Sequence, residues 1–207
     1  DLDRVKNARM LAKLKKLHTN FRSTRIRYTY NINGTKTGRL TSKGNFNALA
    51  LEKPIKSILV PDNDELKIID YNAMDLRTAL KLAGGHQELL DCPDIFECLL
   101  AAYVDIDATL TRDDLKEIVY PYMYGSTTSS LKKKNNPEVV DRFINSTVAR
   151  DLATFKISLY KQARLQKFKY TTPYGRVLNL TDLAGNIGGV FNNIIQSISS
   201  DQAHADF

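Results

Sequence analysis

Cysteines and long apolar runs are scarce in this 207-residue chain, and each scarcity excludes a class of protein. Cys92 and Cys98 are too few for a disulfide framework or a four-ligand zinc site, so we interpret them as packing residues in a reducing compartment. The longest apolar run, Cys98–Val104, is far shorter than the roughly 18 residues of a membrane span. No basic segment followed by an apolar one indicates a secretory signal. The sequence therefore predicts a cytoplasmic protein with no membrane partner.

Acidic residues are scarce in the first 30 positions, which carry two acids against nine lysines and arginines. This excess of seven equals the net charge of the whole chain, 30 basic minus 23 acidic residues. A basic arm of this density suits a nucleic-acid backbone, although a solvated helix face would carry the same charge. Weaker basic clusters lie at 132–134 and at Lys161, Arg164, Lys167 and Lys169.

Apolar periodicity and turn residues predict the first half of the chain to alternate between helix and extended structure. The run at 66–71 indicates a buried strand that delivers Asp70 at its tip. The following helix should stop at Gly84, because glycine is favoured just after a helix C-terminus. The predicted elements are an N-terminal amphipathic helix, a strand at 25–32, a loop at 34–44, a strand at 66–71 and a helix from about 74 to 83.

The second half is predominantly helical in its pattern. Thr111 with Asp114 resembles a capping box, and Pro137 suits a first helical position. The elements expected are a helix at 94–104, a helix from 112, one long helix from 137 through 159, a hairpin at 169–178 and a last helix from about 192. Strands before and after a helical insertion predict an α+β fold.

The segment from Arg112 to Gly125 carries most of the chemical information. As a helix at 100° per residue, it places two cations and then two phenol rings on one slanted stripe. That order matches a nucleoside triphosphate, with polyphosphate first and then sugar and base; an ordinary basic amphipathic face is the alternative. Pro121 predicts a kink, and we hypothesise a hinge there. The stripe is Arg112, Lys116, Tyr120 and Tyr124, and the core face is Leu115, Ile118, Val119 and Tyr122.

With these segments in order, the chain resembles a family A DNA polymerase, the group of bacterial DNA polymerase I and many phage replicases, over nearly all its length. Any one match is weak, whereas five in the right order are specific. Residues 70–77 resemble the family's motif A, 112–125 its motif B, 37–42 with 45–47 its primer-template contact segment, Asn192 with Gln196 and Asp201 its template-side palm helix, and 11–15 the end of its thumb.

The resemblance implies an antiparallel palm sheet with an inserted helical fingers subdomain and a remnant of a helical thumb. Residues 1–24 would be the thumb remnant and 25–85 the first part of the palm. Residues 86–168 would form the fingers and 169–207 the second part of the palm.

The implied reaction is template-directed DNA synthesis, in which a primer 3′-hydroxyl attacks a dNTP and pyrophosphate leaves. Two Mg²⁺ ions are expected in the complete active site, where Asp70 would supply one bridging carboxylate and the Tyr71 carbonyl another oxygen ligand, and Lys116 could protonate the leaving group. The nucleotide-binding residues would be Arg112, Lys116, Tyr120, Tyr124 and Asp75, and the DNA-binding residues Arg39, Asn45, Asn47, Asn192 and Gln196.

Several positions depart from the family's pattern. Asp75 replaces the usual Glu that walls off the sugar 2′ position, so we expect weaker exclusion of ribonucleotides. Phe96 stands where a phosphate-facing His is common, and Gly188 where a DNA-contacting Arg is common. Motif C, with the second catalytic carboxylate, would lie past Phe207. We therefore expect a fragment of a longer polypeptide, or a second chain that supplies motif C.

Two other functions remain open. A single-subunit RNA polymerase shares the cationic helix and the metal aspartate, but the residues after Asp70 and the Asp75 sugar gate stand against it. A split or decayed polymerase that only grips primer-template DNA is the other alternative, because one aspartate cannot hold two Mg²⁺ ions.

Overall fold

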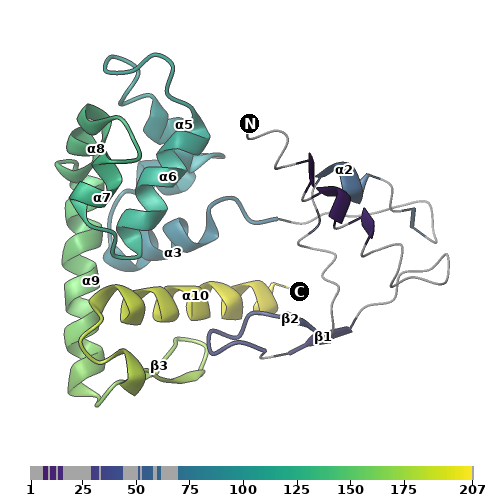
Figure 1. Ribbon diagram of the computed structural model, residues 1–207. Helices are drawn as coiled ribbons and strands as arrows, with labels where there is room; N and C mark the ends of the chain where they lie inside the picture. The colour runs from purple at the N-terminus through teal and green to yellow at the C-terminus, as the bar shows by residue number, and fades with distance from the viewer. Residues whose placement is uncertain are drawn as a thin grey trace. The chain divides into compact units, whose positions relative to one another are not determined.

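The computed structural model describes residues 70–206 continuously and shorter stretches before them (Figure 1). The earlier described residues are 7, 8, 10–12, 14, 15, 29–32, 34–43, 51, 53–57, 60 and 61. Contacts divide the chain into two compact units, residues 1–35 with 40–69 and residues 36–39 with 70–207. The assignment of thumb, palm and fingers segments stays a prediction.

The first unit contains a short antiparallel hairpin. Strand β1 (Thr29–Asn31) pairs with β2 (Thr41–Lys43), and Thr29 lies opposite Lys43. The expected loop at 34–44 is therefore wrong in its second half, because the backbone of 41–43 finds its partners in β1. The described residues between 7 and 15 are helical, as predicted, and the one-turn helix α2 (Lys53–Lys56) buries Ile55.

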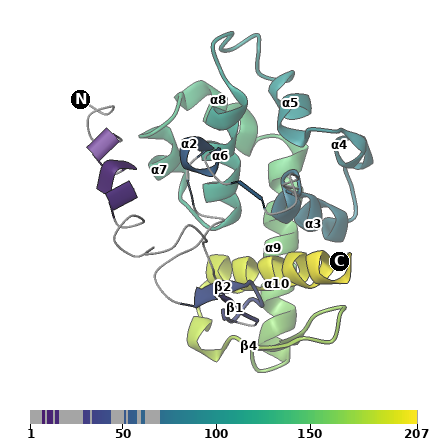
Figure 2. The same cartoon turned by 90° about the vertical axis from the view of Figure 1, so that its right-hand side faces the viewer.

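The second unit is predominantly helical. In Figures 1 and 2, α9 stands upright and α10 runs across it. Helix α3 lies beside α10, and α5 to α8 lie above α10, around the upper part of α9. Its helices are α3 (Met74–Ala83), α4 (Gln87–Asp91), α5 (Ile95–Leu100), α6 (Arg112–Met123), α7 (Thr128–Lys132), α8 (Pro137–Ile144), α9 (Thr147–Leu165), the short 3₁₀ turn η2 (Thr181–Leu183) and α10 (Ile187–Ala205).

The core of this unit forms where α3, α9 and α10 pack on one another. Leu76 and Leu80 of α3, Leu152 of α9 and Ile194 of α10 are fully buried there. Burying each such side chain contributes about 1.5 to 3 kcal/mol. The predicted glycine stop holds: Gly84 has φ +79° and its N–H caps the carbonyl of Leu80.

Three helix boundaries differ from the prediction. The expected long helix from 137 is two helices, because the Ser146 side chain accepts from the N–H of Ala149 and starts α9 as a new helix. The helix expected at 94–104 ends at Leu100, and residues 101–106 form turns. The last helix begins at Ile187, five positions before the expected start, with Asn186 as its N-cap.

The strands that the structure describes form two separate two-stranded sheets, whereas we expected one palm sheet. The second is the predicted hairpin: β3 (Lys169–Thr171) pairs antiparallel with β4 (Val177–Asn179). Of the strand predicted at 66–71, residues 66–69 lie outside the described part, and Asp70 and Tyr71 are not strand. The fold is thus mixed, with many helices and small antiparallel sheets.

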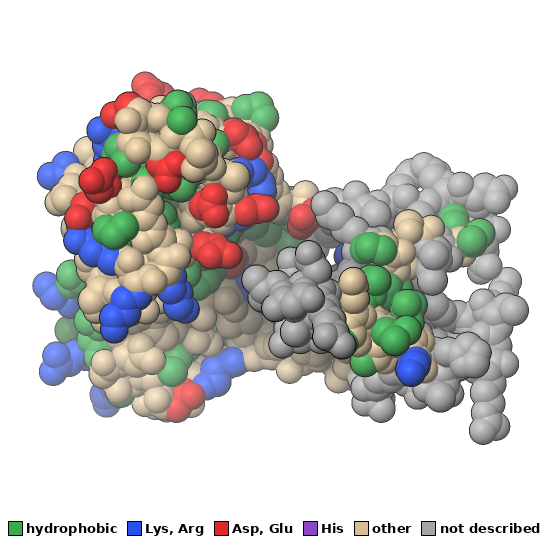
Figure 3. All heavy atoms as spheres, turned by 45° about the horizontal axis from the view of Figure 1, so that its top comes forward, with side chains coloured by type: hydrophobic (Ala, Val, Ile, Leu, Met, Phe, Trp, Pro, Cys, Tyr) green, Lys and Arg blue, Asp and Glu red, His purple; other side chains and the backbone are tan. Residues whose placement is uncertain are grey.

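Charge is unevenly distributed over the second unit. Figure 3 shows Asp and Glu side chains gathered over its upper part, with Lys and Arg side chains along its left and lower margin. Among the helices that the structure describes, none combines the length and apolar character that crossing a bilayer requires.

Candidate functional site

Helix α6 presents the predicted stripe of cations and phenols. A capping box starts the helix: the Thr111 hydroxyl accepts from the N–H of Asp114, whose carboxylate accepts from the N–H of Thr111. Leu115, Ile118 and Val119 are fully buried on the opposite face. The stripe therefore projects from a firmly packed helix. We call Arg112, Lys116, Tyr120 and Tyr124 the α6 ridge.

A buried aromatic ring lies beneath the ridge. The Cζ of Arg112 and the Nζ of Lys116 lie 5.9 and 5.8 Å from the centre of the Phe96 ring, and the Tyr120 ring lies 5.5 Å from it. Phe96 is fully buried. It forms a floor that attracts both cations through its π face and offers no polar atom, unlike a histidine at this position.

The two cations of the ridge are held by neighbouring carboxylates. Arg112 donates from Nε to Asp94 at 2.6 Å, and Lys116 donates to Asp113 at 2.9 Å. Asp94 also caps α5 by accepting from the N–H of Phe96. Burial would raise the pKa of Asp94, but the hydrogen bonds from Arg112 and Asn72 outweigh it and hold the pKa below its ordinary value. Asp94 was not among the predicted site residues, because its partner lies 18 positions away in the sequence.

The far end of the ridge meets Asp75 at the start of α3. Tyr124 donates from its hydroxyl to Asp75 Oδ2 at 2.8 Å, and Arg39 donates to the same oxygen at 2.9 Å. The rings of Tyr120 and Tyr124 stack 6.1 Å apart. Burial, with the charge of Asp75 next, raises the pKa of Tyr120 to about 12 and also raises the pKa of Tyr124. Both phenols therefore stay neutral hydrogen-bond donors at neutral pH.

Asp70 lies close enough to the ridge for its charge to act on Tyr120. Its charge is one of those that raise the pKa of Tyr120, alongside that of Asp75. Asp70 is exposed, and its carboxylate makes no hydrogen bond or ion pair with any residue that the structure describes. Its oxygens are thus available to a ligand. No cluster of three or more His, Cys, Asp or Glu side chains with metal-site geometry occurs among the described residues.

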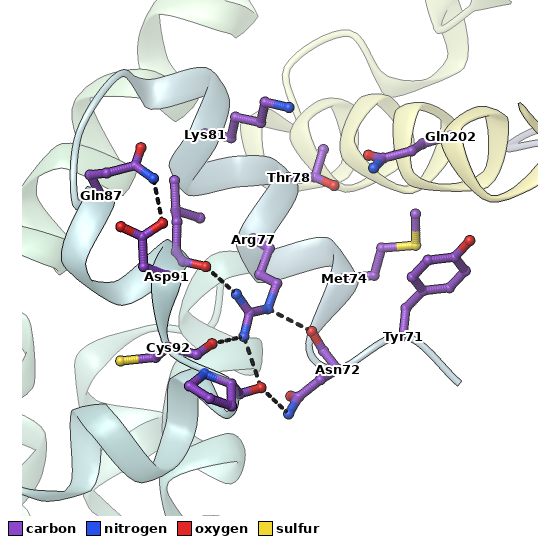
Figure 4. A pocket seen from close by; sticks show the side chains of 12 residues that line it. Tyr71, Asn72, Met74, Arg77, Thr78, Lys81, Gln87, Asp91, Cys92 and Gln202 are labelled. Atoms are coloured by element: carbon purple, nitrogen blue, oxygen red, sulfur yellow. Dashed lines mark hydrogen bonds between the residues drawn. The ribbon is translucent and has the colours of Figure 1, made fainter. Parts of the chain in front are cut away.

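Arg77 fixes the segment between Asp70 and α5. Its guanidinium donates to the carbonyl oxygens of Asn72, Leu90, Cys92 and Pro93 at 2.5 to 3.2 Å (Figure 4). These bonds give Arg77 a structural role. They tie the turn after Asp70 to the turn that carries Asp94.

A cavity of about 560 Å³ lies beside the Arg77 side chain, between α3, α4 and the end of α10. Figure 4 shows Lys81, Gln87, Asp91 and Gln202 around it. Sequence reasoning did not find this cavity, because residues between 71 and 93 form it together with Gln202 of α10, which lies far along the chain from them.

The predicted DNA-side residues are only partly brought together. Arg39 lies at Asp75, as described above, while Asn192 and Gln196 of α10 are bonded to each other at 2.7 Å. Asn45 and Asn47 lie outside the described residues.

Asp201 of α10, part of the predicted template-side segment, is buried rather than open to a ligand. It accepts from Thr172 at 2.8 Å and from Arg176 at 2.7 Å. The Arg176 guanidinium also lies so close to Gly38 that a side chain there would clash with it. Asp201 and Arg176 thereby link the β3–β4 hairpin, α10 and the segment that carries Arg39.

Gly188 stands where the family resemblance would place a DNA-contacting arginine, and the structure explains why this chain has a glycine there. A Cβ at this position would meet the Tyr124 carbonyl oxygen at 2.6 Å and the Cα of Gly125 at 3.2 Å. Backbone contact between α10 and the end of the ridge thus leaves no room for a side chain.

The interpretation of the cysteines as separate packing residues is wrong. Cys92 and Cys98 are joined by a disulfide across the turn between α4 and α5, with Cα atoms 6.6 Å apart. Six positions of separation were sufficient because the turn at Pro93 and Asp94 folds the chain back on itself. The cysteines therefore give no support to a reducing compartment, and the localisation stays a prediction.

Comparison with solved structures gives a match over nearly the whole chain. The matching protein is the polymerase domain of Pol1 from M. smegmatis, solved in complex with DNA primer-template and dNTP, with a TM-score of 0.75. The fold is similar to part of a bacterial Pol1 polymerase domain, of the family A type. The resemblance stated from the motifs is thereby confirmed in the fold, at 17% sequence identity. The match covers 99% of this chain and 42% of the Pol1 chain. No protein-family model and no curated protein matches.

Proposed function

We propose that the chain binds primer-template DNA and a dNTP for template-directed transfer of a dNMP to the primer 3′-hydroxyl, with release of pyrophosphate. The observation that carries this proposal is the Tyr124–Asp75 hydrogen bond at 2.8 Å, because it fixes the end of the α6 ridge beside the segment that starts at Asp70. Two cations, two phenols and two carboxylates then border one site. The primer-template and dNTP bound by the similar Pol1 domain support the same ligands here.

Arg112 and Lys116 would bind the triphosphate. With Nε held by Asp94, the guanidinium of Arg112 keeps a fixed orientation, which suits forked contacts to phosphate oxygens. Asp113 faces both cations and its side chain is 84% exposed, so phosphate can replace it at little cost. Lys116 would neutralise the growing charge and could donate a proton to the leaving pyrophosphate.

Tyr120, Tyr124 and Asp75 would surround the sugar and base of the incoming nucleotide. The stacked phenols supply an aromatic wall, and Asp75 lies at the end of it, fixed by Tyr124 and Arg39. Asp75 is one methylene shorter than the usual Glu. We expect an Asp75→Glu variant to exclude ribonucleotides more strongly in competition assays between dNTP and NTP; equal exclusion would count against the sugar-gate role.

Mg²⁺ fits the oxygen donors at this site. The Asp70 carboxylate has no partner among the residues that the structure describes, the Tyr71 carbonyl follows it, and magnesium is commonly held by one or two carboxylates together with substrate phosphates. Two Mg²⁺ ions, when bound, would stabilise the charge on the attacking and leaving oxygens. In this proposal the chain's own residues hold Asp70 near the ridge, and the ridge orients the triphosphate.

The proposed DNA contacts are Arg39, Asn45, Asn47, Asn192 and Gln196, with the basic N-terminal arm adding charge for the phosphate backbone. Arg39 contacts Asp75, which we assign to the nucleotide site, so in this proposal Arg39 would lie between the DNA and the incoming dNTP.

Binding of a fluorescently labelled dNTP to the chain, with primer-template and Mg²⁺ present, tests the proposal by anisotropy. Arg112→Ala and Lys116→Ala should each weaken binding about tenfold or more, because each removes a charge-assisted hydrogen bond. Lys133→Ala on the neighbouring α7 turn is the matched control and should bind as the wild type does. Wild-type affinity in Arg112→Ala would refute the assignment of the ridge.

Two activity measurements separate the alternatives. Mg²⁺-dependent primer extension by this chain would exclude a non-catalytic DNA-binding role. Preference for NTPs over dNTPs on the same primed template would favour the RNA polymerase reading instead.

A further inference from the structure

A second charged surface lies on the outer face of α9. Residues 152–181 contain six lysines and arginines and no Asp or Glu. Two of the six have internal partners: Lys156 donates to the carbonyl of Tyr122, and Arg176 pairs with Asp201. The other four, Lys161, Arg164, Lys167 and Lys169, are exposed and have no ion pair with any residue that the structure describes.

Apolar side chains accompany these cations. Ile157 is 47% exposed and Leu165 86% exposed, and both lie on the same face of α9 as the cations. At 100° per residue, Arg150, Ile157, Lys161, Arg164 and Leu165 fall within an arc of about 100° and extend about 22 Å along the axis. We call these five residues the α9 stripe.

The stripe faces away from the candidate nucleotide site. The opposite side of α9 buries Leu152, Leu159 and Ala163, and α9 packs there against α3 and α10. In Figure 1, α3, α6 and α10 all lie on one side of the upright α9. A ligand on the stripe would therefore not be the nucleotide bound at the ridge.

The nearest acidic residue on α9 does not neutralise the stripe. Asp151 lies at its edge and is paired with His86 at 2.9 Å. No other acid occurs on α9, so the stripe keeps its full positive charge. A negatively charged partner gains from this field at the moment of encounter.

We propose that the α9 stripe docks an acidic protein segment that also carries apolar side chains, in a helix or extended strand. Glu or Asp side chains would pair with Arg150, Lys161 and Arg164, and aliphatic or aromatic side chains would cover Ile157 and Leu165. The apolar residues decide between partners of the same charge, because a nucleic-acid backbone offers nothing to cover them and a peptide does.

The test uses three fluorescently labelled probes of equal charge with the full chain. One is a peptide of about 20 residues with two leucines eight positions apart, matching Ile157 and Leu165, and with glutamates between them. The second replaces both leucines with serine, and the third is a single-stranded oligonucleotide. We expect the leucine peptide to bind at least about tenfold more tightly than the serine peptide, and binding to weaken as salt rises.

Variants localise the binding. Lys161→Glu combined with Arg164→Glu, and separately Leu165→Ser, should each weaken binding of the leucine peptide about tenfold. The matched control, Lys133→Glu with Lys134→Glu on the turn after α7, makes the same charge change at exposed positions and should leave binding unaltered. Thermal unfolding and labelled-dNTP binding should be unchanged in all three variants.

Three results would overturn the proposal. Equal affinity of the leucine and serine peptides would remove the apolar part of the recognition. An equal loss in the Lys133/Lys134 control would mean that charge alone acts. Tighter binding of the oligonucleotide, lost in the Lys161/Arg164 variant, would make the stripe a nucleic-acid surface.

Discussion

Arg77 and Asp94 are two charged residues that place the α6 ridge without belonging to it. Arg77 holds the carbonyl oxygens of the turn after Asp70, of Leu90 in α4 and of the turn before α5, and Asp94 in that last turn holds Arg112. The side chains of Arg77, Asp94 and Arg112 therefore connect the segment after Asp70 to the ridge and fix their relative placement. A lysine in place of either arginine would keep the charge and lose the planar fork that makes these contacts.

An Arg77→Lys variant should lower the free energy of unfolding by about 2 to 3 kcal/mol, because a lysine cannot satisfy all four carbonyls at once, three of which are partly buried. Urea denaturation measures this. Arg150→Lys, the same substitution at an exposed position, should change stability by less than about 0.5 kcal/mol. Equal effects in the two variants would mean that the four hydrogen bonds from Arg77 contribute no stability.

Tyr120 should make the protein less stable at alkaline pH. Burial, then the charge of Asp75, raises the pKa of Tyr120 to about 12. Between about pH 10 and 12 the folded phenol keeps a proton that the unfolded one loses, so the free energy of unfolding falls as pH rises through this window. Tyr120→Phe should make that fall shallower in urea titrations at several pH values, whereas Tyr174→Phe at an exposed site should not. An unchanged slope in Tyr120→Phe would contradict the raised pKa.

Elements of the second unit are joined by backbone contact as well as by side chains. The first turn of α10 meets the end of α6 where Gly188 touches Gly125 and the carbonyl of Tyr124. Side chains at either glycine would push the helices apart, and Gly125 also has φ +101°, which favours glycine. The spacing between α10 and the ridge is thus set by the absence of a Cβ.

Gly188→Ala should destabilise the protein by about 2 kcal/mol, because its Cβ would lie 2.6 Å from a backbone oxygen that cannot move independently. Labelled-dNTP binding should weaken along with it if the ridge shifts. Gly85→Ala is the control, since no atom lies within 4 Å of its Cβ, and its stability should stay the same or rise slightly. Chemical denaturation compares the two; a Gly188→Ala variant as stable as Gly85→Ala would show that the helices can separate freely.

Over the whole molecule, positive charge is concentrated in two places that serve different partners in our proposals. The first 30 residues carry seven net positive charges, and the outer face of α9 carries the second concentration. The α6 ridge, by contrast, has its cations paired with Asp94 and Asp113. Charge for a DNA backbone and charge for a triphosphate are therefore separate.

Replacing Lys13, Lys15 and Lys16 together by Gln should weaken primer-template binding and reduce the slope of log affinity against log salt by about 2 to 3. The matched triple variant at Lys132, Lys133 and Lys134 removes the same charge from the α7 region. It should leave the slope unchanged in the same titration. A slope that falls equally in both variants would mean that total charge, and not the N-terminal arm, determines binding.

The sequence by itself determined the ridge, its capped start and three of the four residues expected on its buried face, because these depend on residues three to four positions apart in one helix. The fourth, Tyr122, is only partly buried and donates to the carbonyl of Ala149. The sequence likewise determined the 169–178 hairpin, the Gly84 stop and the resemblance that the fold confirms. Tertiary structure alone decided that Asp94 holds Arg112, that Tyr124 meets Asp75, that Gly188 touches Tyr124, and that Cys92 and Cys98 are bonded. It also decided that Ser146 splits one expected helix into two. Each of these depends on which partner is nearest once separate segments pack together, and spacing along a chain contains no such distance.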